Sequence, residues 1–190
     1  MKSTLGDPAD RILAAAYDLF TQRGVRAVGV DEIIARAGVA KATFYRHFHS
    51  KDDLILAFLH RRGDVWTHGW LEKETLKRSD DPKKRLLAIF DVMDSWFQRD
   101  DFEGCPFIGI VGHPQPHDRV RKEAVSQMGM IQGFVRKLAQ DAGAKNADSL
   151  AASWQTLMAG SIVMALSGNL GAAQLAKTAA EALLTQGGPL

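Results

Sequence analysis

The residues best suited to contact a polyanion lie close together in the first third of the chain. The basic residues between Arg36 and Lys51 are Arg36, Lys41, Arg46 and Lys51, and no Asp or Glu lies among them. The whole 190-residue chain has a formal net charge of only +2, so this excess is local. Basic groups gain free energy at a nucleic acid mainly by releasing counterions from its phosphates. The spacing therefore predicts a cationic patch that binds DNA.

The elements that must position these side chains are two short helices. A glycine-containing turn at Gly38 separates a helix containing Ile33 and Ile34 from a second helix at about Lys41–His47, the pattern of a helix-turn-helix. At about 100° per residue, Phe44 shares its face with the following Phe48, and this face must point into the core. The opposite face is short and polar.

The roles of the polar face follow from reach and chemistry. Lys41 and Arg46 can donate to guanine O6 and N7, whereas Ala42 or Thr43 can touch a thymine methyl group. Contacts to phosphate position a protein without reading sequence. Lys51 suits a phosphate because it starts the next helix, whose first N–H groups are free. The predicted DNA-binding residues are Lys41, Ala42, Thr43, Tyr45, Arg46, His47 and Lys51.

The remaining periodic segments are also helical, and no run of alternating residues predicts a strand. Caps are expected at Asp7, Ser50, Asp81 and Asn146, with Gly24 ending the first helix. The helix that begins near Ser50 is expected to reach Trp70 or beyond. Later helices are expected over about residues 82–97, 118–142, 149–166 and 172–186, with a short helical piece after Gly104.

The segment from Ala9 to about Phe58 resembles the N-terminal DNA-binding domain of the TetR family of bacterial transcriptional regulators. The matching residues are Ile12-Leu13-Ala14-Ala15-Ala16, Phe20, Gly24, Ile33, Ala37-Gly38-Val39, Thr43-Phe44-Tyr45, Phe48 and Ser50-Lys51-Asp52-Asp53-Leu54. Gly29 and Ala40 depart from the hydroxyl residues common in the family, which removes two possible phosphate contacts. The resemblance implies an all-α homodimer of about nine helices that binds a palindromic operator. It also implies a helix-turn-helix domain at residues 1–50 and a helical effector-binding and dimerisation domain at residues 51–190.

The C-terminal helices carry the two tasks that the family resemblance assigns to this region. Small residues let helix backbones approach closely, and we expect a two-fold interface there. The expected interface residues are Leu150, Leu157, Gly160, Ile162, Ala172, Leu175, Ala179 and Leu183. Ligand pockets are mostly apolar, although aromatic residues at helical spacing often form plain core. The candidate pocket residues are Trp66, Trp70, Phe90, Met93, Phe97, Cys105, Phe107, Met128 and Phe134.

The sequence therefore predicts a cytoplasmic transcriptional repressor that a small apolar effector releases from its operator. No signal peptide is expected, because Met1–Pro8 has one lysine and no apolar run. No membrane span is expected, because the longest weakly polar stretch, Ser161–Gly171, is short. A nonspecific DNA-binding protein is the alternative. A metal-binding protein or enzyme built on Cys105, His113, His117 and Asp118 is disfavoured because two prolines interrupt the histidine spacing. No cofactor and no metal are expected.

Overall fold

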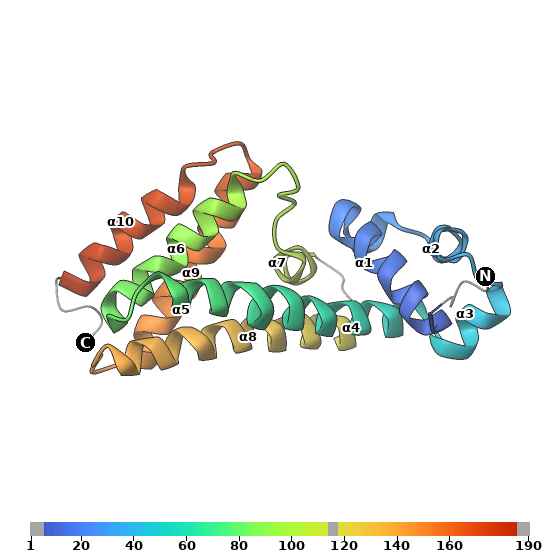
Figure 1. Cartoon of the computed structure of the whole chain (residues 1–190), viewed down its shortest axis with the longest axis horizontal. Coiled ribbons are helices and arrows are strands. Elements are labelled where there is room, and N and C mark those ends of the chain that lie inside the picture. Colours follow the sequence, from blue (N-terminus) through green and yellow to red (C-terminus); the bar gives the residue numbers. More distant parts are fainter. Residues whose placement is uncertain (1–5, 114–117, 186–190) are drawn as a thin grey trace. The chain divides into compact units, whose positions relative to one another are not determined.

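The computed structural model describes residues 6–113 and 118–185, and every regular element within these ranges is helical, as predicted (Figure 1). Because α4, η1 and α5 follow one another without a break, they form one continuous helical segment, and the described residues contain nine such helical segments in all. The elements are α1 (Pro8–Ala27), α2 (Val30–Ala37), α3 (Lys41–His47), α4 (Lys51–Arg62), the π-helical η1 (Gly63–Leu71), α5 (Glu72–Arg78), α6 (Pro82–Phe97), α7 (Pro106–Val111), α8 (Asp118–Asp141), α9 (Ala147–Leu166) and α10 (Ala172–Thr185).

Local capping explains where several helices begin. The side chains of Asp7, Ser50, Asp81 and Asn146 accept hydrogen bonds from the backbone N–H groups of Ala9, Asp53, Lys84 and Ser149 at 3.0–3.1 Å. These contacts satisfy N–H groups that have no partner within the helix. All four predicted caps are confirmed.

Packing divides the chain into two compact units. The N-terminal unit comprises Met1–Gly63 and Pro106–Val125, and the C-terminal unit comprises Asp64–Cys105 and Ser126–Leu190. The packing boundary thus differs from the division expected after residue 50. The reason is that α4 and α7 both pack against α1. Within this unit the Phe58 ring on α4 lies edge-on to those of Tyr17 and Phe20 on α1.

The turn between α2 and α3 depends on a glycine. Gly38 adopts the left-handed conformation (φ 62°) and its N–H donates to the Ala35 carbonyl at 3.2 Å. Only glycine adopts this backbone without strain. Gly24 is likewise at positive φ (75°) and kinks α1, after which the helix resumes to Ala27, so the expected end at Gly24 is a kink instead.

A π-helical segment replaces the regular α-helix expected through Trp70. A Cβ on Gly69 would lie 2.9 Å from the carbonyl oxygen of Asp64, five residues earlier, which is closer than a real Cβ approaches. Glycine at this position therefore allows the wide turn. π-Helical segments occur frequently at functional sites, and this one carries Trp66 and Trp70.

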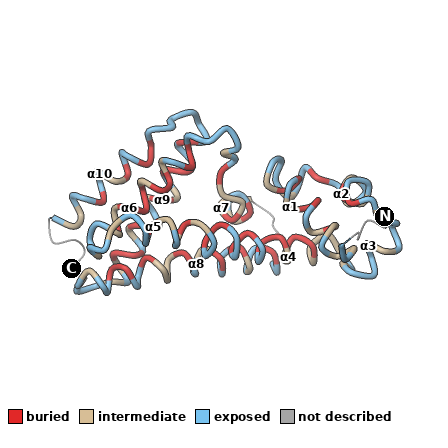
Figure 2. The backbone as a smooth tube through the Cα atoms, viewed as in Figure 1, coloured by how far each residue is buried: buried red, intermediate tan, exposed pale blue. Residues whose placement is uncertain are grey.

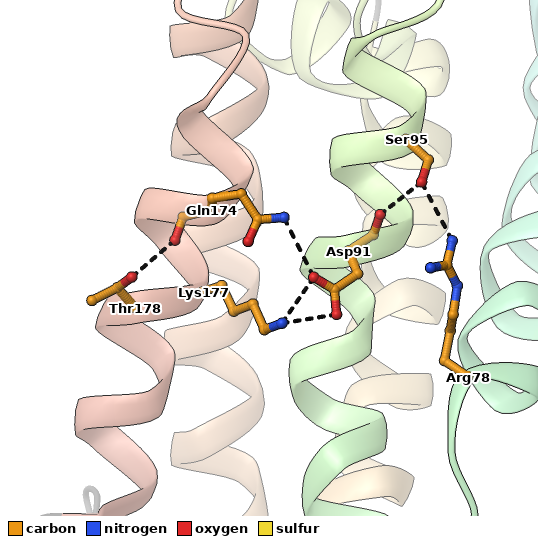
Figure 3. Close-up of polar contacts among 6 residues, drawn as sticks. All are labelled: Arg78, Asp91, Ser95, Gln174, Lys177 and Thr178. Carbon is orange, nitrogen blue, oxygen red and sulfur yellow. Dashed lines mark hydrogen bonds and ion pairs between the residues drawn. The ribbon is translucent and has the colours of Figure 1, made fainter.

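The C-terminal unit packs α6, α9 and α10 against one another. The buried indole of Trp154 on α9 donates to the Leu86 carbonyl of α6 at 3.0 Å. The Lys177 ammonium of α10 donates to both carboxylate oxygens of Asp91 on α6, at 2.8 and 2.9 Å (Figure 3). Gln174, one turn earlier, donates to the same carboxylate at 3.3 Å. These contacts fix which side of α10 faces α6.

Candidate nucleic-acid interface

Helix α3 is divided into one buried position and an exposed face. Phe44 is fully buried, whereas most of the helix is exposed (Figure 2). The exposed side chains are those of Lys41, Ala42, Tyr45, Arg46 and His47, while Thr43 is half-buried. The helical arrangement predicted from the sequence thus places all these candidates on or beside the accessible surface of α3.

Three aromatic rings contact one another along α3 and at its C-terminal end. The Phe44 ring lies 6.1 Å from the ring of Phe48, which is half-buried at the end of the helix. The Tyr45 ring meets Phe44 edge-on at 5.2 Å while remaining 42% exposed. Tyr45 is therefore anchored on its apolar side and accessible on the other, which suits a hydroxyl group that positions a partner.

Acidic side chains from outside the basic run neutralise part of its charge. The Lys41 ammonium lies 3.3 Å from an Asp31 carboxylate oxygen, and Arg36 lies 3.2 Å from Asp18. Arg46 is exposed and has no ion-pair partner among residues 6–113 and 118–185. Two of the four basic residues between Arg36 and Lys51 are thus paired with acidic residues that lie outside this segment of the sequence.

Lys51 lies half-buried at the start of α4, directly after the Ser50 cap. Burial lowers the pKa of Lys51, and the positive charge of Arg26 lowers this pKa further, against an opposing effect of Asp52. An anion placed beside the ammonium would favour its charged form. The first N–H groups of α4 would favour an anion at the same place.

Replacing Lys51 with alanine is expected to weaken binding to every DNA duplex by a similar factor. The slope of log affinity against log salt should become shallower by about 0.9, the value for one lost phosphate contact. Because the pKa of Lys51 is lowered in the unbound protein, wild-type affinity should fall as the pH rises through that lowered pKa. Lys51→Arg stays charged, so it should lose less affinity than the wild type as the pH rises toward the ordinary lysine pKa. Titrations of a labelled duplex at several salt concentrations and pH values measure the salt slope and the pH dependence. Identical pH profiles for the wild type and Lys51→Arg would count against the phosphate role of Lys51.

The predicted pocket residues do not all come together. Trp66, Trp70 and Phe97 join one aromatic cluster through Trp96, whose ring centroid lies 4.9 Å from that of Trp66. Phe102 closes the cluster at 4.9 Å from both Trp96 and Phe97. Trp96 is not among the pocket residues predicted from the sequence, although it follows the candidate Met93 by three positions on α6.

The other candidates differ in burial and in the unit to which they belong. Phe90 and Met93 are fully buried, and Phe90 packs against Trp154 rather than against this cluster. Cys105, Met128 and Phe134 are half-buried. Phe107 belongs to α7 in the N-terminal unit. A pocket formed by these residues therefore stays a prediction.

The expected interface residues fall on two sides of α9 and α10. Leu150, Ile162 and Ala172 are buried inside the C-terminal unit, while Leu157 and Leu183 are half-buried. Gly160, Leu175 and Ala179 are exposed. Large apolar side chains outside the predicted interface set are also exposed, namely Val163, Met164 and Leu166 on α9 and Leu170 just after it.

Helix α9 is apolar on both sides, which explains this distribution. Its outward residues Val163 and Leu166 are 50% and 56% exposed, although the opposite side is core. By length and composition alone, α9 is one helix in the described part of the chain that is long and apolar enough to cross a membrane. A core helix of a soluble protein passes the same test.

The alternative metal site lies only partly within the described residues. Within residues 6–113 and 118–185, no three His, Cys, Asp or Glu side chains are grouped so as to hold a metal ion. His113 is instead hydrogen-bonded to the guanidinium of Arg26. His117 lies outside the described residues.

Comparisons with known proteins agree on one family. Residues 12–58 match the profile described as "Bacterial regulatory proteins, tetR family". The transcriptional activator FasR of Mycolicibacterium smegmatis is 38% identical over 90 residues, which are 47% of this chain and 40% of FasR. The transcriptional repressor Rv3405c of Mycobacterium tuberculosis is 37% identical over 83 residues, 42% of this chain and 44% of that protein. The chain therefore spans less than half the length of these curated relatives.

Solved structures extend the likeness of the fold to nearly the whole chain. A TetR-family transcriptional regulator from Streptomyces coelicolor superposes with a TM-score of 0.83 at 24% identity, covering 96% of this chain and 97% of that one. A TetR regulator from Streptomyces avermitilis gives 0.77 at 26% identity, covering 93% and 99%. These proteins are described as transcriptional regulators, not as enzymes. Residues 12–58 therefore carry a domain of the tetR family of bacterial regulatory proteins, and the fold of nearly the whole chain is similar to those of solved TetR regulators.

Proposed function

We propose that the protein is a cytoplasmic transcriptional regulator that binds a palindromic DNA operator as a homodimer. The observation that carries the proposal is α3, a short helix with a buried phenylalanine and an exposed face of basic, hydroxyl and small side chains. In helix-turn-helix proteins the second helix of the motif enters the major groove. Here that helix is α3.

The exposed side chains suit two kinds of contact. Lys41 and Arg46 would donate to guanine, and Ala42 or Thr43 would touch a thymine methyl group. Tyr45, His47 and Lys51 would contact phosphates and fix the position of α3 on the duplex. Each good base contact would contribute roughly 1–3 kcal/mol of discrimination against the wrong base pair.

A homodimer would form through the outward sides of α9 and α10. Leu175 is 65% exposed, and Val163, Met164 and Leu166 on α9 are exposed as well. Lys177 and Gln174 face α6 (Figure 3), so Leu175 and Ala179 lie on a different side of α10. An isologous interface would bury this apolar surface twice. The dimer would then hold its two copies of α3 about 34–36 Å apart, one helical turn of DNA.

The C-terminal unit would bind a small apolar effector that releases the protein from DNA. Its cluster of Trp66, Trp70, Trp96, Phe97 and Phe102 offers apolar and aromatic surface beside a π-helical segment. An effector that binds the DNA-incompetent state more tightly shifts the population toward that state. We propose repression as the direction of regulation. Among the relatives, FasR is described as an activator and Rv3405c as a repressor.

Selection of bound duplexes from a random pool tests the proposal. The full-length protein should enrich a two-fold symmetric sequence and bind it at least 1,000-fold more tightly than random duplex, as specific regulators do. Equal affinity for every duplex would instead indicate a nonspecific DNA-binding protein. Sedimentation equilibrium of the same preparation should give a dimer at micromolar concentration, and a monomer would contradict the proposed interface.

A further inference from the structure

An ion pair joins the first turns of the two helix-turn-helix helices. Asp31 lies in the first turn of α2, and Lys41 is the first residue of α3. The Lys41 Nζ atom donates to Asp31 Oδ1 at 3.3 Å. The side chains are 66% and 84% exposed, so a bound duplex could reach both.

We propose that Asp31 is a specificity-determining residue of this DNA-binding surface. Its carboxylate directs the Lys41 ammonium toward base edges and reduces attraction to DNA of any sequence. The inference rests on the proposed function, because it assigns a task within the same protein–DNA interface.

The donor inventory of lysine supports this role. An ammonium group has three N–H donors and a flexible four-carbon stem. One donor is directed at Asp31, which leaves two for guanine O6 and N7. Without the carboxylate, the ammonium would be free to turn toward the nearest phosphate, a contact that carries no sequence information.

The charge of Asp31 has a separate effect, because a carboxylate on a DNA-facing surface is repelled by phosphates whatever the sequence. This repulsion lowers the affinity for every duplex by a similar factor and leaves the specificity ratio unchanged. Specificity is a difference between two affinities, so Asp31 would raise it only through the direction that it gives to the Lys41 ammonium.

A simpler role for Asp31 is to stabilise the start of α2. The residue before α2, Gly29, provides no side-chain cap, and acidic residues in a first turn interact favourably with the helix dipole. Glu32 also lies in the first turn of α2, but it pairs with Arg23 at 2.5 Å rather than with Lys41. Glu32→Gln is therefore a matched control, since it removes the same charge from the same turn.

The experiment compares the full-length wild type with Asp31→Asn and Glu32→Gln. Affinities are measured across a salt series for the duplex that the wild type selects and for random duplex. Asp31→Asn should bind random duplex about three- to tenfold more tightly at low salt, with a slope steeper by about 0.9. It should gain less on the selected duplex, so its specificity ratio should fall at least threefold. Glu32→Gln should change both affinities by the same factor. An unchanged ratio in Asp31→Asn, or an equal fall in Glu32→Gln, would overturn the proposal.

A double-mutant cycle with Lys41→Ala tests whether Asp31 acts through the lysine. In the Lys41→Ala background, Asp31→Asn should leave the specificity ratio unchanged because the group it directs is gone. A further fall in the ratio would show that Asp31 acts without Lys41 and would overturn the assignment. If the wild type itself prefers no sequence, the proposed function fails. That outcome is distinct from one in which the wild type prefers a sequence and Asp31→Asn keeps the same preference, which would overturn this inference alone.

Discussion

Replacing Phe44 with alanine is expected to lower the free energy of unfolding of the N-terminal unit by about 3–5 kcal/mol, the usual cost of deleting a buried phenylalanine ring. Phe44 is fully buried, and its ring contacts those of Tyr45 and Phe48. In a seven-residue helix this is the one buried residue. Its loss should release α3 from the N-terminal unit and abolish DNA binding together with the fold.

Thermal unfolding and amide hydrogen exchange measure this effect. Exchange should accelerate in α2 and α3, whereas α6, α9 and α10 should keep their protection because they belong to the other unit. Phe44→Leu is the control, since it keeps most of the apolar volume and should cost less than alanine. A Phe44→Ala protein with unchanged exchange in α3 and full DNA affinity would contradict the assigned core position.

Replacing Leu175 with arginine is expected to convert a dimer into monomers. Leu175 is the most exposed large apolar side chain that the structure describes, at 65%. In an isologous interface each substitution occurs twice, and an unpaired charge is costly to bury. Affinity for a palindromic duplex should fall at least 100-fold, because each monomer would bind one half-site alone.

Sedimentation equilibrium and duplex titration measure this change. Val65→Arg is the matched control, because Val65 is also exposed, at 51%, but lies on η1 rather than on α9 or α10. Val65→Arg should remain dimeric and bind DNA as the wild type does. A dimeric Leu175→Arg protein with undiminished affinity would place the interface elsewhere.

Local sequence signals predicted those parts of the fold that local chemistry determines. The caps at Asp7, Ser50, Asp81 and Asn146 were predictable because a side-chain oxygen three or fewer residues away satisfies the first N–H groups of each helix. The burial of Phe44 followed from helical periodicity.

Features that depend on packing between distant residues could not be predicted in the same way. The pairing of Lys41 with Asp31 depends on how α2 and α3 cross and on side-chain rotamers. Helix α9 is apolar on both sides, so periodicity did not identify Val163 and Leu166 as its outward residues. The π-helical turn at Gly69 has no sequence signature comparable to a cap, since isolated glycines occur in regular helices as well.

The most direct test of the central claim is a comparison of the duplexes selected by the wild type and by Arg46→Ala. Arg46 is exposed on α3, so its removal should leave the fold intact. We expect the variant to bind the same symmetric sequence with lost preference at one base pair in each half-site, at a cost of roughly 1–3 kcal/mol per contact. Identical base preferences and affinities for the two proteins would contradict the claim that the exposed face of α3 reads DNA.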